Sequence, residues 1–217
     1  IAQFYEPKKA TINQFVWGLF LLTLGLFQKV VLADTLLSGV SDSVFSAGKV
    51  LNFWDSWAGT LAFSGQIFFD FACYSTAAIG IALMLGIILP DNFLYPYGAI
   101  GFSDFWKRWH MSLSRFLRDY LYIPLGGNRK GEARRFTNLM ITMLLGGLWH
   151  GAAWTFVLWG GLHGVFLVIN HGWIKIKRRL GLPATAGWFG RLIAGTLTFL
   201  AVTVAWVFFR ADSVSSA

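Results

Sequence analysis

Long apolar runs dominate this chain and restrict the folds that it can adopt. Because a backbone group in lipid has no water to bond, such runs fold as helices. About 20 apolar residues cross the hydrocarbon core as a helix, so the two longest runs suit either one tilted helix or two broken ones. The four runs cover residues 11–37, 54–89, 136–169 and 188–209, with glycine breaks possible at Gly80 or Gly86. We predict an all-α, polytopic membrane protein with four or five spans.

Composition supports a membrane protein and argues against a nucleic-acid partner. Only 13% of the residues are charged and 56% are hydrophobic, whereas a soluble domain carries about 25% charged residues. The net charge of +8 comes from basic groups at the ends of apolar runs, at residues 8–9, 129–135 and 175–179. That distribution is typical of membrane-helix flanks. We expect a single membrane domain over residues 1–217, a loop over 41–52 and a polar connection over 175–179.

Residues 102–125 have a different pattern, in which apolar residues recur at three- or four-residue spacing and basic residues interleave with them. This pattern predicts one amphipathic helix, lying in the membrane interface or packed with a polar face inward. Ser103 and Asp104 are its expected N-cap. The basic loop after it, residues 126–131, lacks the spacing of a nucleotide loop. It could instead meet lipid headgroups or the phosphates of an acyl donor.

Two histidines are the strongest candidates for chemistry. His150 lies inside the apolar run 136–169, and His110 precedes it in the amphipathic segment. An ionisable group in a membrane span is costly to bury, so it indicates function. A neutral imidazole can take a proton from a hydroxyl, and the second histidine could orient the acceptor. The alternative is that both histidines only bridge helices, and His163 is expected to make helix-packing hydrogen bonds.

Asp70 is a carboxylate in the middle of an apolar helix and therefore needs a partner. Arg108, Arg115 or a histidine could supply it, and a structural ion pair with an arginine of segment 102–125 is favoured over a catalytic role. We expect no metal, because no histidine pair has the spacing of a helical zinc site. The single cysteine, Cys73, excludes an intrachain disulfide and is expected to pack in the core.

Several segments resemble the membrane-bound O-acyltransferase family, especially its bacterial alginate O-acetylation branch, with teichoic-acid D-alanyl-transferring proteins as cousins. They are residues 70–75, 105–114, 117–129 and 144–156. The invariant histidine of the family maps onto His150, and a His or Asn position maps onto His110. One departure is Thr76-Ala77, where many members of that branch have Asp-Met, so the polysaccharide stays open. Because the chain begins with Ile1, we expect a fragment of a longer acyltransferase.

The resemblance implies a multi-pass enzyme of the bacterial inner membrane without a bound cofactor. It would move acetyl groups from a cytoplasmic-side donor, such as acetyl-CoA, toward hydroxyls of an exported polysaccharide. Transfer would be direct or through a secreted or periplasmic acetyltransferase partner. His150 and His110 would be catalytic. The residues that would bind substrate or support the site are Trp109, Trp149, Asp70, Arg108, Arg118 and Asn128. The alternative class is a proton-coupled transporter or channel subunit, which the lack of a recognisable inverted repeat disfavours.

Overall fold

The computed structural model describes residues 2–5, 9–48, 50–183 and 187–217, and these residues form helices and connections without a strand. They divide into two compact units, Ile1–Phe93 and Leu94–Ala217. Four helical segments are long and apolar enough to cross a membrane: Ile12–Phe45, Phe53–Met84, Trp154–Arg179 and Trp188–Arg210. The predicted all-α, polytopic class is therefore confirmed. The single domain over 1–217 stays a prediction.

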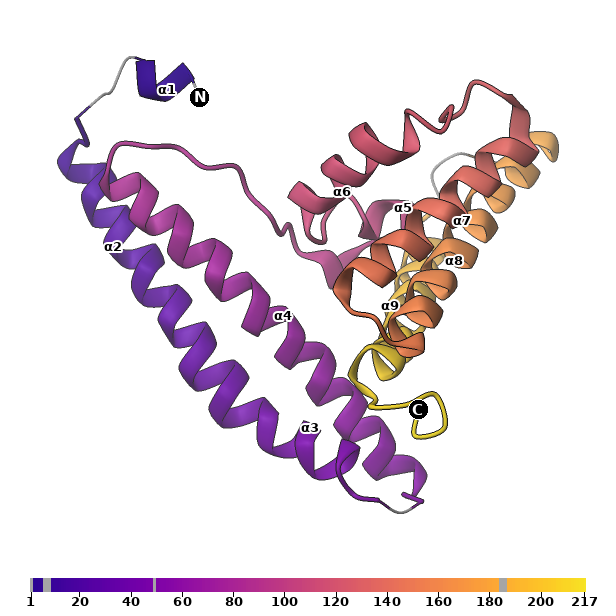
Figure 1. The fold of residues 1–217 in the computed structure, drawn as a ribbon, viewed down its shortest axis with the longest axis horizontal. Helices are drawn as coiled ribbons and strands as arrows, with labels where there is room; N and C mark the ends of the chain where they lie inside the picture. The colour runs from indigo at the N-terminus through magenta and orange to yellow at the C-terminus, as the bar shows by residue number, and fades with distance from the viewer. Residues whose placement is uncertain (1, 6–8, 49, 184–186) are drawn as a thin grey trace. The chain divides into compact units, whose positions relative to one another are not determined.

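The first unit is an antiparallel helical pair (Figure 1). One side runs through α2 (Ile12–Phe27), the π-helical segment η1 (Gln28–Leu37) and α3 (Ser38–Phe45), and the other is α4 (Phe53–Met84); a short helix, α1 (Ala2–Tyr5), precedes them. Thr11 starts α2 with a capping box, in which its hydroxyl accepts from the Gln14 backbone and Gln14 accepts from the Thr11 N–H. The loop predicted over 41–52 begins only after Phe45, because helical turns continue through the polar residues.

Glycines let α2 and α4 pack backbone against backbone. A Cβ on Gly18 would lie 2.5 Å from the Gly80 carbonyl oxygen, and one on Gly25 would lie 2.8 Å from the Cys73 carbonyl oxygen. Small residues give this close approach in membrane helices. Gly80 therefore serves packing and does not break the helix, so the apolar run 54–89 contains one long helix, α4. It ends at Met84, and Gly86 then adopts a left-handed conformation with φ 79°.

The second unit contains α7 (Gly131–His150), α8 (Trp154–Arg179) and α9 (Trp188–Arg210). The apolar run 136–169 thus forms two helices, with the break just after His150. A Cβ on Gly147 would collide with the Phe156 carbonyl oxygen, and one on Gly160 with the Met143 carbonyl oxygen, so α7 and α8 form a tight antiparallel hairpin. The basic residues at 175–179 lie in the last turns of α8, and the expected polar connection starts only at Leu180.

Segment 102–125 is not one helix. After a short 3₁₀ turn, η2 (Pro96–Gly98), it consists of α5 (Phe102–Phe105), α6 (Met111–Leu117) and the π-helical turn η3 (Arg118–Tyr122). The predicted continuous helix is wrong because His110 adopts a left-handed conformation, φ 43° and ψ 56°. The predicted N-cap is also wrong. Gly101 caps α5, while the Ser103 N–H donates to Asn170 on α8 at 3.0 Å, so tertiary bonds set where the helix starts.

Candidate active site

His150 ends α7 in an aromatic setting contributed by three helices. Its ring centroid lies 4.9 Å from that of Trp149, 5.2 Å from Trp159 on α8 and 5.1 Å from Phe209 on α9. The tight Gly147–Gly160 crossing fixes the end of α7 one turn before this histidine. The ring is half-buried. Apolar surroundings favour a neutral imidazole, which is the form that a general base needs.

His110 reaches the same neighbourhood from the turn between α5 and α6. Its ring centroid lies 6.4 Å from that of Trp149, so the Trp149 indole contacts both candidate histidines. Burial lowers the pKa of His110 to about 4, and the nearby His150 lowers it as well. His110 is therefore uncharged at neutral pH and can donate a hydrogen bond from one ring nitrogen while it accepts one at the other. The catalytic roles of the two histidines stay predictions.

Because His110 has a left-handed backbone, substitutions there should affect folded yield and turnover in different orders. A left-handed residue other than glycine costs about 1–2 kcal/mol, and Asn and His tolerate it best. In the full-length protein, His110→Gly should therefore fold at least as well as wild type, His110→Asn slightly less well, and the β-branched His110→Val poorly. Turnover should follow a different order, with Asn above Gly, because an amide can still orient a substrate. Folded yield by size exclusion and acyl transfer per folded molecule are the measurements.

Equal turnover of the Asn and Gly variants of His110 would contradict a supporting role for its side chain. The backbone conformation alone would then explain why a histidine is tolerated at this position. Leu113→Val, one turn into α6 and in right-handed conformation, is a matched control for the steric effect of β-branching. That substitution should leave folded yield nearly unchanged.

His163 lies deep in the second unit and differs from the sequence-based expectation. It is fully buried, and its ring packs 4.8 Å from Trp159, 5.2 Å from Trp106 and 5.9 Å from Phe105, by centroids. Neither ring nitrogen has a hydrogen-bond partner among the described residues. The predicted helix-packing hydrogen bonds are therefore wrong within this part of the chain. Aromatic contacts hold the ring instead, with Trp159 in contact with both His163 and His150.

The other predicted site residues of the second unit are held mainly by near neighbours. Arg108 donates to Asp104 at 2.9 Å, and Arg118 pairs with the adjacent Asp119 at 2.7 Å. Asn128 accepts from the Tyr122 hydroxyl at 2.6 Å. Trp109 is buried against Trp206, with ring centroids 5.0 Å apart, whereas Trp149 is 63% exposed. These contacts give the two arginines a local structural role, and substrate contact for this set stays a prediction.

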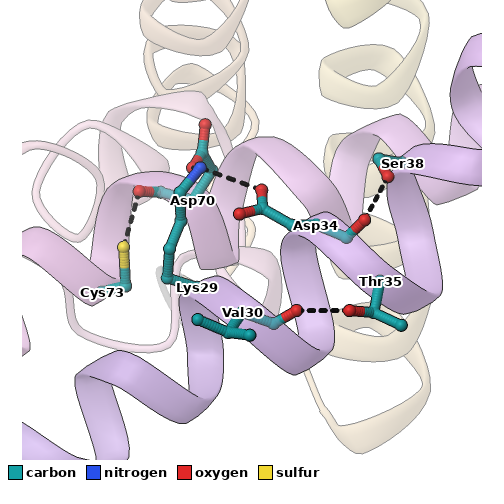
Figure 2. Close-up of polar contacts among 7 residues, drawn as sticks. All are labelled: Lys29, Val30, Asp34, Thr35, Ser38, Asp70 and Cys73. Carbon is teal, nitrogen blue, oxygen red and sulfur yellow. Dashed lines mark hydrogen bonds and ion pairs between the residues drawn. The ribbon is translucent and has the colours of Figure 1, made fainter.

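Asp70 pairs with Lys29 of η1 at 2.5 Å, and Lys29 also donates to Asp34 at 2.9 Å (Figure 2). The observed partner is thus a lysine of the same unit that the sequence pattern did not indicate, and a pair with an arginine of segment 102–125 stays a prediction. The π-helical register explains the cluster, because its wider turn brings Lys29 and Asp34, five residues apart, onto one face. Cys73 is buried as predicted, and its thiol donates to the Asp70 carbonyl oxygen at 2.9 Å.

Sequence reasoning missed a pocket of 560 Å³ that lies entirely in the second unit. One of its walls is built by Arg135 on α7, which donates to the Nδ1 atom of His171 on α8 at 2.6 Å. The helical spacing of Arg135 and Leu139, which both line the pocket, was the available signal. Within the described ranges, no three His, Cys, Asp or Glu side chains come together as a metal site would require.

Membrane-length helices, a glycine-packed hairpin and two histidines beside one indole define a polytopic helical membrane protein with a candidate site at the end of α7. The chain belongs to the membrane-bound O-acyltransferase family, whose sequence model matches residues 3–209. It is 44% identical to a peptidoglycan O-acetyltransferase of Helicobacter pylori over 217 residues, which is 99% of this chain and 40% of that protein.

Two further relatives extend this comparison. A probable alginate O-acetylase AlgI of Pseudomonas putida is 44% identical over 210 residues, covering 97% of this chain and 41% of the relative. A teichoic acid D-alanyltransferase of Streptococcus thermophilus is 34% identical over 170 residues, covering 73% and 41%. The chain thus spans about two fifths of the length of these relatives.

Proposed function

We propose that this chain carries the catalytic centre of a membrane O-acyltransferase that moves acetyl groups toward hydroxyls of an exported polysaccharide. The observation that carries the proposal is the placement of His150 and His110 against the same indole, in a chain of this family. The names of two relatives, a peptidoglycan O-acetyltransferase and a probable alginate O-acetylase, support acetyl as the group and a glycan as the acceptor.

The chemistry follows from a neutral imidazole in apolar surroundings. His150 takes the proton of the acceptor hydroxyl while the hydroxyl oxygen attacks the carbonyl carbon of an acyl thioester such as acetyl-CoA. The new C–O bond forms, the C–S bond breaks, and the thiol leaves with the proton that the imidazolium returns. His110 orients the acceptor or acts as a second base. A secreted or periplasmic acetyltransferase would receive the acetyl group where transfer is relayed.

We also propose that the protein lies in the inner membrane, and this placement leads to a topology prediction. Lys175 pairs with Glu132, and Arg135 bonds His171, so the basic stretches around 129–135 and 175–179 share one end of the α7–α8 hairpin. Because Lys- and Arg-rich short segments stay inside, both should face the cytoplasm. In a cysteine-free full-length background that includes Cys73→Ser, Lys130→Cys and Arg179→Cys should react with an impermeant maleimide only after permeabilisation. Labelling of both in intact spheroplasts would refute the orientation, and labelling of one alone would refute the shared end.

One experiment separates acyl transfer from the rival transporter function. Purified full-length protein in proteoliposomes, given acetyl-CoA labelled in the acetyl group and a glycan oligomer, should form a covalent acetyl ester detectable by mass spectrometry. A transporter would instead move labelled solute or protons across the vesicle without forming a new ester. Absence of ester, with or without a secreted acetyltransferase partner added, would overturn the proposal.

A further inference from the structure

The 560 Å³ pocket of the second unit has a cationic lining. Four lining residues carry positive charge, and none of the lining residues is Asp or Glu; the cations are Lys107, Arg115, Arg118 and Arg135. Asp119 offsets part of this charge through its pair with Arg118. The volume lies in the range of small-molecule sites, about 300–1,000 Å³. A concave surface of this charge favours an anionic ligand.

Three of the residues that line the pocket also carry hydrogen-bond donors that the described part of the protein leaves unused. Three lining side chains each carry a buried polar atom without a hydrogen-bond partner among the described residues: Ser103 Oγ, Trp106 Nε1 and Arg135 Nε. A buried donor without a partner costs free energy, so nearly all such groups are satisfied in native proteins. Three in one pocket, all able to donate, indicate a ligand that presents several acceptor oxygens.

The contact between Arg135 and His171 prepares the guanidinium for such a ligand. An arginine always donates, so His171 Nδ1 must be the unprotonated nitrogen that accepts. This bond uses one terminal Nη2 group and fixes the plane of the guanidinium, while Nε stays available. A fixed planar fork matches the oxygens of a phosphate and loses less entropy on binding than a flexible ammonium does.

We propose that this pocket binds a phosphate or diphosphate group, with Arg135, Trp106 and Ser103 as the inner donors and the other cations around them. Arg135 and His150 lie fifteen residues apart on α7, which is about 22 Å along the helix axis. A phosphate held by Arg135 would therefore lie well away from His150, whereas the Trp106 end of the pocket approaches that histidine through Trp159, with ring centroids 6.0 and 5.2 Å apart. That separation suits either the anionic end of an extended acyl donor, an assignment that rests on the proposed function, or the headgroup of an anionic lipid.

Direct binding tests the site without requiring turnover. Full-length protein in nanodiscs of zwitterionic lipid is titrated with inorganic pyrophosphate and with CoA by calorimetry. Arg135→Gln should weaken binding about 10- to 100-fold, as expected for a charge-assisted bond, and Trp106→Phe or Ser103→Ala about 5-fold. Trp106→Phe keeps the ring packing, so it remains informative if Arg135→Gln folds poorly.

Matched controls lie next to the pocket and outside it. Arg134→Gln changes the neighbouring arginine, which is exposed and does not line the pocket, and Trp173→Phe removes an indole N–H from the exposed face of α8. Both should leave affinity within about twofold. Equal loss of affinity in Arg134→Gln and Arg135→Gln would reduce the effect to general surface charge and overturn the proposal, as would unchanged binding in all three pocket variants.

A second arm identifies the source of the phosphate. The same proteins in nanodiscs containing phosphatidylglycerol are analysed for retained lipid by native mass spectrometry. If Arg135→Gln lowers lipid retention and pyrophosphate displaces lipid, the pocket holds a headgroup. If CoA binds with the variant pattern above and lipid retention is unchanged, it holds the donor. Both results support a phosphate site, and neither depends on acyl transfer, so the proposed function can fail while this site stands.

Discussion

His150→Ala in the full-length protein should reduce acyl transfer about 10²- to 10⁴-fold, because positioned general acid–base catalysis contributes that much to rate. Membrane insertion should stay intact, since the half-buried ring is held by aromatic contacts with Trp159 and Phe209 that other side chains at this position can partly replace. His150→Gln is the sharper variant, because an amide fills the same space and keeps hydrogen bonding but has no basicity. We expect it to restore folded yield and thermal stability without restoring turnover.

His163→Gln is the matched control for this experiment. It makes the same substitution at a second histidine that contacts Trp159, but the ring there is fully buried. We expect it to lower folded yield and to change turnover per folded molecule much less than His150→Gln does. Near wild-type transfer by purified His150→Gln would show that His150 is not the base. Its role would then be to bridge α7, α8 and α9.

The membrane spans were predictable because their signal is local. Apolar length sets the number of long helices, and the lipid environment leaves the backbone no alternative to helix. The run 136–169 was expected to form one tilted helix or two, and the position of its break, after His150 where α7 ends, was not predicted. Gly80 shows the limit of that reasoning. A glycine that breaks a helix and one that lets two helices touch look alike in sequence, and only the opposing Gly18 decides.

The prediction of one continuous helix over 102–125, within the second unit, failed for a tertiary reason. The apolar spacing of this segment suits a helix, yet hydrogen bonds from Gly101 to Thr198 and from Ser103 to Asn170 hold its start against α9 and α8. The chain then turns at His110 in a left-handed conformation. Both partners are more than 60 residues away in sequence, so no local pattern could reveal them.

The candidate site was predictable only in part. His150 and His110 could be selected because ionisable groups in apolar runs are rare and because their motifs resemble a family. The phosphate pocket could not, since its walls come from residues 103–171 on several elements. The partner of Asp70 could not be predicted, because residues 28–37 form a π-helix and not an α-helix. In an α-helix, residues 29 and 34 would point to different sides, and the π-helical turn of η1 puts both on one face, where Lys29 bonds Asp34 and Asp70.

That cluster gives the second large effect that we expect. Lys29 lies between two carboxylates, Asp34 and Asp70 (Figure 2). Lys29→Met would leave both carboxylates without their cation inside a membrane-spanning segment, at roughly 2.5–3.5 kcal/mol for each charge near the centre of a span. Folded yield of the full-length protein should therefore fall severely. Asp70→Asn should be milder, because the Lys29–Asp34 pair remains neutral without it.

The decisive comparison is the double variant. If the cluster is structural, Lys29→Met combined with Asp70→Asn should recover folded yield relative to Lys29→Met alone, since one uncompensated charge disappears. Asp91→Asn, in the exposed turn after α4, is the matched control for removing a carboxylate and should leave yield unchanged. Acyl transfer per folded molecule decides the role of Asp70. If Asp70 is structural, folded Asp70→Asn protein should retain most turnover. Normal folded yield with abolished turnover would instead assign Asp70 to the catalytic site, with Lys29 as the residue that positions it.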